Sequence, residues 1–285
     1  MKSIKNNKKV VKKIFGALKY FSLIFFSFIS VLPIVSCVIT AFKTEKEYNN
    51  TNVMTLPKSW FNFSNFTDAW KQAGMGRAFL NSLIILVCVL TISTLIGTQI
   101  AYVLSRFKFV GNTIIRSLFL FATLLPGIAM QIAVYQMMFK LGLINSILGY
   151  VIMMCGTDII SIYIYIQFFE NISVSLDESA IVDGAGYFRI YWSILLPLLK
   201  PAIVTSCILK GVATYNEYYA ANLYLQDKTK YATVATSLYT FVGPLGSKYN
   251  LICAGVIISL LPALVIFITC QKQIYNGLTA GSVKA

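Results

Sequence analysis

The chain has 285 residues, of which 57% are hydrophobic and only 12% are charged, and its mean hydropathy is +0.72. Soluble domains carry about 25% charged residues, so this composition excludes an ordinary soluble globular protein. The net charge is +14, and the complete absence of histidine excludes histidine proton relays, histidine-dependent nucleophiles and histidine zinc sites.

Six apolar stretches dominate the sequence. Each is long enough to cross a bilayer core of about 30 Å, which takes about 20 apolar residues in a helix. They cover residues 20–42, 79–104, 115–139, 147–169, 194–224 and 250–271. The third contains Pro126 and Gly127, which predict a kink. No loop is long enough to form a second domain. We therefore predict an all-α integral membrane protein in which residues 1–285 form a single domain with six transmembrane helices.

Basic residues indicate how these spans are oriented. Lysines without any acid precede the first span, and Arg106, Lys108 and Arg116 lie between the second and third spans. Positive charge concentrates on the cytoplasmic side, so we expect both termini to be cytoplasmic. The loop at 43–78 would then be outside, although its own basic residues weaken the asymmetry. This placement of charge favours membrane topology over nucleic-acid binding.

The start of the chain also fits a cleaved signal, since residues 34–37 resemble a lipoprotein cleavage box. The apolar run continues past Cys37 to Phe42, however, and five more spans follow, so we expect an uncleaved first span. The cysteines all fall inside expected spans, without metal-ligand spacing. We expect them to pack as small hydrophobic side chains and predict no metal site.

The segment 172–193, between the fourth and fifth spans, is longer than a simple turn requires. Ser175 and Glu178 fit a capping box, which predicts a helix beginning near Leu176. Asp177 and Glu178 would lie in its first turn, where acids complement the helix dipole. Gly184 would allow a sharp turn, and a second helix would start near Tyr187 and lead into the fifth span. An apolar stripe on the first helix would comprise three residues: Leu176, Ala180 and Ile181.

Two interpretations of this hairpin follow from the residues alone. The small residues Ser179, Ala180 and Ala185 would permit the close approach of a soluble partner. The hairpin could equally lie in the membrane interface as an amphipathic segment that only orients the fifth span.

A resemblance decides between them. The run Glu178-Ser-Ala-x-x-Asp183-Gly-Ala, followed by Leu196-Pro-x-x-x-Pro201, resembles the cytoplasmic loop of ABC-importer permeases. The Asp-Gly-Ala form is similar to the carbohydrate, maltose-type, binding-protein-dependent branch. Two positions depart from the pattern, Ser179 in place of alanine and Ser173 in place of a common proline. The resemblance covers most of the chain, including LPKSWFNFSNFTDAW, AYVLSRFKFVG, KLGLINSILG and NGLTAGSVKA.

This resemblance implies a permease subunit of an ATP-driven importer. The chain would form half of the pathway for a sugar or oligosaccharide delivered by an external binding protein. The implied partners are a second permease in a heterodimer, an ATPase dimer, an extracytoplasmic sugar-binding protein and the lipid of a prokaryotic plasma membrane. ATP and magnesium would bind to the separate ATPase, because this chain has no GxxxxGK[ST] run. We therefore expect no bound cofactor and no enzymatic activity.

The resemblance also assigns expected contacts. The ATPase would bind a coupling helix in the hairpin, through Glu178, Ser179, Ala180, Asp183, Gly184 and Ala185. The C-terminal tail would reach between the ATPase subunits through Gly277, Thr279 and Gly281.

Ionisable residues inside the spans need a reason, because each costs about 2.5–3.5 kcal/mol at the bilayer centre. Asp158 in span four and Lys210 in span five would lie at similar depth, so they could pair or face a polar cavity. Each could instead be satisfied separately by backbone, water or the partner permease. Asn216, Glu217 and Tyr218 lie on the outer half of span five, where they would line the path or simply pack.

Three alternatives stay open. The solute of the importer could be something other than a sugar. An autonomous secondary transporter would show internal repeats, and none is visible. An intramembrane enzyme would need a cluster of acid, base and nucleophile at one place, which the sequence does not suggest.

Overall fold

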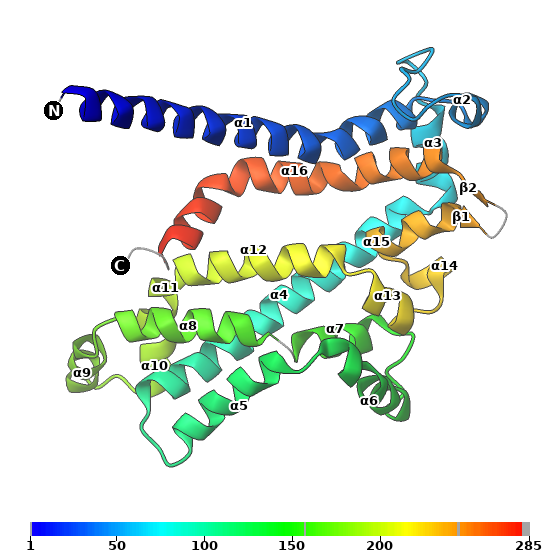
Figure 1. Ribbon diagram of the computed structural model, residues 1–285. Helices are drawn as coiled ribbons and strands as arrows, with labels where there is room; N and C mark the ends of the chain where they lie inside the picture. The colour runs from blue at the N-terminus through cyan, green and yellow to red at the C-terminus, as the bar shows by residue number, and fades with distance from the viewer. Residues whose placement is uncertain (1, 157, 244–245, 281–285) are drawn as a thin grey trace. The chain divides into compact units, whose positions relative to one another are not determined.

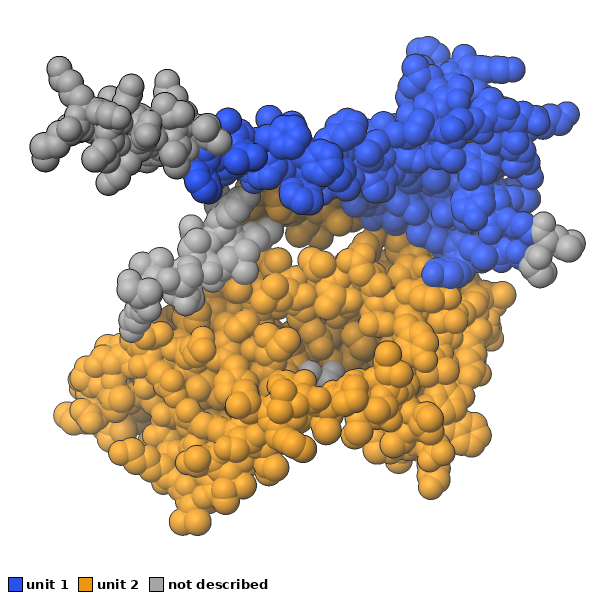
Figure 2. Space-filling view, in the orientation of Figure 1, with its two compact units in different colours: residues 1–73, 238–261 blue, residues 74–237, 262–285 orange. Residues whose placement is uncertain are grey.

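The computed structural model describes residues 2–156, 158–243 and 246–280 (Figure 1). Within these residues the regular secondary structure is helical apart from one short hairpin of strands. Its contacts divide it into two compact units. Unit 1 comprises residues 1–73 and 238–261, and unit 2 comprises residues 74–237 and 262–285 (Figure 2).

Unit 1 is built around the first long helix and the start of the last one. The antiparallel strands pair Val242 with Ser247 and Gly243 with Gly246. The elements are α1 (Lys2–Ala41), α2 (Glu45–Asn50), α3 (Ser64–Gln72), the 3-10 helix η2 (Leu238–Phe241), β1 (Val242–Gly243), β2 (Gly246–Ser247) and the first part of α16 (Tyr249–Ala280).

Buried polar side chains hold α3 inside unit 1. The Asn65 amide donates to the carbonyl oxygens of Ala41 and Lys43, both at 2.7 Å, and the Asn65 side-chain oxygen accepts from Asn250 at 2.9 Å. The Lys43 side chain is fully buried, and its ammonium donates to the Asn52 carbonyl at 2.7 Å. These bonds satisfy carbonyl groups at and beyond the end of α1, which a helix leaves without intrahelical partners.

Unit 2 contains the remaining elements and the later part of α16. In chain order they are α4 (Met75–Arg106), α5 (Asn112–Leu124), α6 (Gly127–Lys140), α7 (Ile147–Cys155), α8 (Ile159–Asn171), α9 (Ser175–Val182), α10 (Tyr187–Ile190), the π-helix η1 (Tyr191–Leu195), α11 (Leu196–Leu198), α12 (Lys200–Asn216), α13 (Tyr219–Tyr224), α14 (Lys228–Tyr231) and α15 (Val234–Ser237).

The long helix α4 is the centre of unit 2, and α7, α8 and α12 pack along it. Its buried face carries small residues at positions 78 and 82 and again at 93, 97 and 101, which lets neighbouring helices approach closely. These residues are Ala78, Ser82, Ser93, Gly97 and Ala101. A Cβ at Gly97 would lie 3.1 Å from the Tyr165 ring of α8. The small residues therefore set how closely α4 and α8 pack.

Three helices of the described chain are long and apolar enough to cross a membrane. They are Phe15–Ala41, Met75–Arg106 and Tyr249–Gln271, and they match the expected first, second and sixth stretches. Three bent helix pairs would raise the number to six if each pair forms one span. Between α5 and α6 the bend is 103°, and it falls at Pro126, where the sequence predicts a kink.

The other two bent pairs divide the expected fourth and fifth stretches. Helices α7 and α8 meet at 46°, and Tyr187–Leu198 meets α12 at 72°. Pro197 and Pro201 flank this second bend, as expected of a residue that interrupts helical hydrogen bonding. The helix then ends at Asn216, so the expected stretch 194–224 is not continuous, and α13 is a separate short helix.

Candidate functional site

Residues 172–193 form a helical hairpin, which we call the coupling hairpin. Its first helix, α9, ends in a turn in which the Ala185 amide donates to the Ala180 carbonyl and the Gly184 amide donates to the Ile181 carbonyl, both at 2.9 Å. This pair of bonds defines a Schellman motif, whose turn residue adopts a left-handed conformation. Gly184 has a φ of +79°, which glycine adopts without steric cost. The expected turn at Gly184 and the second helix starting at Tyr187 are thus confirmed.

The start of α9 differs from the expected capping box. The helix begins at Ser175 itself, and the preceding Val174 makes no side-chain capping bond. The Ser175 amide instead donates to the Ser173 hydroxyl at 3.3 Å. Because Ser175 lies inside the helix, its side chain cannot cap it, and the Ser173 hydroxyl accepts this bond instead. Asp177 and Glu178 do lie in the first turn, where acids favour the helix dipole.

The buried side of α9 also differs from the expected apolar stripe. Asp177 and Ala180 are buried, whereas Leu176 and Ile181 are 43% and 47% exposed. The helix is therefore rotated relative to the expectation, because it turns a charged residue inward to meet Arg106. Ala180 was expected on the exposed surface, and its burial corrects that expectation. Its small side chain lets α9 lie close to the rest of unit 2.

The outward side of the hairpin combines acids with apolar side chains. Four of the expected contact residues are exposed, namely Glu178, Ser179, Asp183 and Gly184, and Ala185 is half-buried. Val182 and Phe188 are 85% and 76% exposed beside them. Large apolar side chains exposed in a group occur where another protein or a membrane covers the surface.

An ion pair joins the hairpin to the end of α4. The Arg106 Nε lies 2.7 Å from the Asp177 Oδ2, and the two side chains are only 8% and 12% exposed. The same guanidinium donates to the Ile172 carbonyl at 2.9 Å. Burial raises the pKa of the Asp177 carboxyl above its ordinary value, and the adjacent Arg106 charge opposes that rise.

Aromatic rings surround this ion pair. Tyr102 of α4 lies 5.5 Å from the ring centres of both Phe107 and Tyr191, and Phe107 lies 5.2 Å from Tyr187 of the hairpin. The hydroxyls of Thr98 and Tyr191 are hydrogen-bonded at 2.8 Å. Rings at such separations attract each other beyond simple area burial. The end of α4 and the second helix of the hairpin therefore form one packed cluster.

The loop between α4 and α5 is fixed on the same bundle. Arg116 pairs with Glu170 at 2.8 Å and donates to the Leu104 carbonyl, and the Asn112 amide donates to the carbonyls of Leu104 and Phe107. Sequence reasoning used Arg106 and Arg116 only as topology signals and Asp177 only as a dipole partner. One sequence signal pointed to a contact of Arg106 with a distant segment. It is an arginine at the end of an apolar helix, and no acidic residue lies near it in the sequence.

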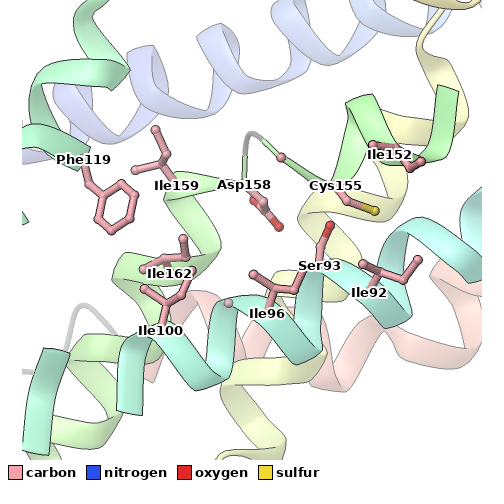
Figure 3. A pocket seen from close by; sticks show the side chains of 12 residues that line it. Ile92, Ser93, Ile96, Ile100, Phe119, Ile152, Cys155, Asp158, Ile159 and Ile162 are labelled. Atoms are coloured by element: carbon pink, nitrogen blue, oxygen red, sulfur yellow. The ribbon is translucent and has the colours of Figure 1, made fainter. Parts of the chain in front are cut away.

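Asp158 lies at the break between α7 and α8 and lines a cavity of about 330 Å³. Isoleucines from α4, α7 and α8 form most of the wall, and Ser93 and Cys155 add polar atoms (Figure 3). The Ser93 hydroxyl is buried and makes no hydrogen bond among the described residues. Asp158 therefore faces a space that is largely apolar, with a single buried hydroxyl on the opposite wall.

Lys210 makes a different contact from the pairing considered above. Its ammonium donates to the Met154 carbonyl at 3.0 Å, and the ion pairs of the described residues do not include Asp158 with Lys210. A backbone carbonyl thus contacts Lys210, whereas Asp158 faces the cavity.

The remaining path candidates make local contacts. The Asn216 amide donates to the Val212 carbonyl at 3.0 Å, and the Glu217 carboxylate accepts from the Ala220 amide at 2.8 Å. Glu217 therefore stabilises the start of α13, and Tyr218 beside it is half-buried. In the tail, the structure gives only the backbone of Gly277 and Thr279, at the end of α16, and Gly281 lies outside the described residues.

Comparisons with known proteins identify relatives of the whole chain. Residues 93–274 match the family described as "Binding-protein-dependent transport system inner membrane component". The chain is 29% identical over 255 residues to the melibiose/raffinose/stachyose import permease protein MelC of Bacillus subtilis (strain 168), covering 89% of this chain and 91% of the relative. It is 29% identical over 282 residues to the maltodextrin transport system permease protein MalD of Streptococcus pneumoniae (strain ATCC BAA-255 / R6), covering 98% and 99%.

A solved structure shares the fold. It is the crystal structure of a bacterial ABC transporter involved in the import of the acidic polysaccharide alginate, one chain of which aligns with a TM-score of 0.80. The alignment covers 91% of this chain and 96% of that one, at 23% sequence identity.

Proposed function

This chain belongs to the family of inner membrane components of binding-protein-dependent transport systems, and we propose that it is one of two permease subunits of an ATP-driven importer for a sugar or oligosaccharide. It is a multi-pass membrane protein. The proposed cargo follows the sugars in the names of the relatives from Bacillus subtilis and Streptococcus pneumoniae, each matched over most of its length. Its membrane is the plasma membrane of a prokaryote.

The proposed orientation places both termini and the coupling hairpin in the cytoplasm. Basic residues at the N-terminus and around Arg106 support it, because cytoplasmic loops attract positive charge. A separate ATPase dimer then docks on the hairpin, and an external binding protein delivers the sugar on the other side. A second, different permease completes the pathway, and the tail with Gly277, Thr279 and Gly281 reaches the ATPase.

The docking proposal depends mainly on one observation, which is that the two sides of the hairpin differ. One side is fixed to α4 by a buried ion pair, and the other exposes Glu178, Ser179 and Asp183 among uncovered apolar side chains. A segment that only oriented the next span would not need a rigid, acidic, exposed face. The Glu178 carboxylate offers an ion-pair partner for a basic residue of the ATPase, and Gly184 gives the turn that places it.

A co-purification experiment tests the docking. Glu178→Lys reverses the exposed charge, and we expect the importer isolated through its second permease to lose the ATPase while keeping this chain. Asp68→Lys is the control, since Asp68 is also exposed but lies on α3 of unit 1 and is not part of the hairpin. Retention of the ATPase by the Glu178 variant would contradict the docking role.

A reconstitution experiment tests the transport function. The complete importer in liposomes should take up a radiolabelled raffinose-type or maltodextrin oligosaccharide only with internal ATP and the loaded binding protein. Uptake without ATP would indicate a secondary transporter. ATP-driven uptake of a non-sugar solute, with no uptake of any oligosaccharide, would contradict the proposed cargo.

For the translocation path we propose a contribution from Asp158 and Lys210, with Asn216, Glu217 and Tyr218 beyond them. The cavity beside Asp158 supports this assignment. A half-exposed carboxylate inside a span is costly, and such residues usually mark a functional pathway. The local bonds of Asn216 and Glu217 favour a supporting role for these two, in which they shape the end of α12 and the start of α13.

A further inference from the structure

Arg106, the last residue of α4, is held differently from an ordinary residue at the end of a membrane helix. Basic side chains at such positions usually extend into the headgroup region. Arg106 instead turns into the protein, where it contacts Asp177 of α9 at 2.7 Å and the carbonyl of Ile172, the first residue of the hairpin, at 2.9 Å. Its side chain is 8% exposed. A single guanidinium therefore joins the end of one span to the first residue of the hairpin and to the first turn of α9.

We propose that Arg106 and Asp177 act as a latch that makes α4 move together with the coupling hairpin. The proposal rests on the proposed function, because it assumes that an ATPase moves the hairpin. Both are positioning residues, since they touch neither ATP nor cargo. Without such a link, force on the hairpin reaches α8 and α12 through the chain itself, but it reaches α4 only through side-chain contacts.

Burial makes this contact suited to transmitting force. Among the described residues the only charged partner of the Asp177 carboxylate is Arg106, so the Arg106 charge is its main compensation. An exposed ion pair exchanges readily with water, but a buried one cannot separate without leaving a charge in an apolar surrounding. The pair therefore resists being pulled apart during a movement of α9.

The surrounding contacts complete the link. Tyr102 and Phe107 at the end of α4 pack against Tyr191 and Tyr187 of the hairpin, and the Tyr102 hydroxyl donates to the Tyr187 carbonyl at 3.5 Å. These rings fix the orientation, and the ion pair fixes the separation. Together they leave α9 and the end of α4 no freedom to slide past each other.

The latch predicts that its loss uncouples ATP hydrolysis from transport. The complete importer carrying Arg106→Gln or Asp177→Asn is assayed in liposomes for cargo taken up per ATP hydrolysed. We expect this ratio to fall about tenfold, within the range typical of coupling between distant sites, while the ATPase still co-purifies. Arg106→Lys keeps the charge, and we expect it to retain more of the ratio than Arg106→Gln.

Glu170→Gln is the matched control. It removes the ion pair between Glu170 of α8 and Arg116 of α5. This pair is far more exposed than the latch, at 49% for the glutamate side chain. We expect this variant to transport with an unchanged ratio.

An unchanged ratio in both Arg106→Gln and Asp177→Asn would overturn the latch. So would loss of the ATPase in these variants, because the pair would then serve to fold the hairpin. Failure of the proposed function gives a different result, since the unaltered importer would then take up cargo without ATP.

Discussion

Gly184 of the hairpin has a left-handed backbone conformation, which residues other than glycine adopt with difficulty. Its φ of +79° closes the Schellman motif, and an added Cβ would meet no atom within 4 Å. Gly184→Ala therefore costs backbone strain alone, about 1–2 kcal/mol for a left-handed residue. We expect faster amide hydrogen exchange across α9 in this variant.

Gly186 supplies a matched control for that measurement. It has a φ of −74° and equally open surroundings, so Gly186→Ala should leave the exchange of α9 unchanged. Equal exchange in the two variants would show that the turn does not depend on the left-handed conformation.

The Arg106–Asp177 pair leads to a stability prediction as well. Arg106→Met removes one partner of a buried ion pair and leaves the Asp177 carboxylate uncompensated, at a cost of about 3–5 kcal/mol. The double variant Arg106→Met/Asp177→Leu replaces both charges with apolar groups and should recover most of this loss. Thermal unfolding of the purified protein in detergent measures both. A double variant as unstable as the single one would contradict a compensating role for the pair.

For single residues, the sequence predicts the features that depend only on neighbouring residues. Gly184 follows from turn chemistry, and the acids in the first turn of α9 follow from the helix dipole. The partner of Asp177 does not follow, because Arg106 lies on another helix and periodicity carries no information about contacts between distant segments. The same missing contact explains why α9 buries Asp177 and Ala180 rather than the expected apolar stripe.

Close packing of the turn between α6 and α7 depends on Gly149. A Cβ there would lie 2.0 Å from the Leu143 carbonyl oxygen, which is a backbone atom that cannot rotate away. Gly149→Ala must therefore shift the turn, and overpacking of this kind costs about 1–3 kcal/mol. We expect a lower unfolding temperature for the purified protein.

The comparison variant for this turn is Gly211→Ala in α12. The added Cβ would lie 3.6 Å from the Leu90 side chain, an ordinary contact, and alanine favours a helix over glycine. This variant should be at least as stable as the unaltered protein. If Gly149→Ala matched it, the tight contact at Leu143 would be disproved.

The ends and bends of the helices also divide into those that the local sequence predicts and those that depend on distant contacts. Apolar length predicts the six stretches, and Pro126 predicts the break between α5 and α6. The size of the bends, 103°, 46° and 72°, was not predictable, because each angle depends on how the two helices pack against the rest of unit 2. Asp158 shows the same limit, since only the fold reveals that it lies at a break and beside a cavity.

Among the described residues, large apolar side chains are exposed along α1, α4 and α5, as in a membrane protein. The proposed topology puts residue 59 outside and residue 179 in the cytoplasm, and both are exposed serines. In an otherwise cysteine-free chain, Ser59→Cys should react with a membrane-impermeant maleimide in intact cells. Ser179→Cys, in cells that do not express the ATPase proposed to cover this position, should react only after permeabilisation. The reverse pattern would invert the topology.

The family assignment rests on the whole chain, whereas the proposed mechanism depends on one contact between the hairpin and a separate motor protein. That contact is tested most directly by placing a photoreactive amino acid at Val182, which is 85% exposed, in the assembled importer. Illumination should crosslink this chain to the ATPase, whereas the same probe at Phe61, also 85% exposed, should not. Crosslinking of the ATPase at Phe61, or its absence at Val182 in an importer that transports with ATP, would contradict the account.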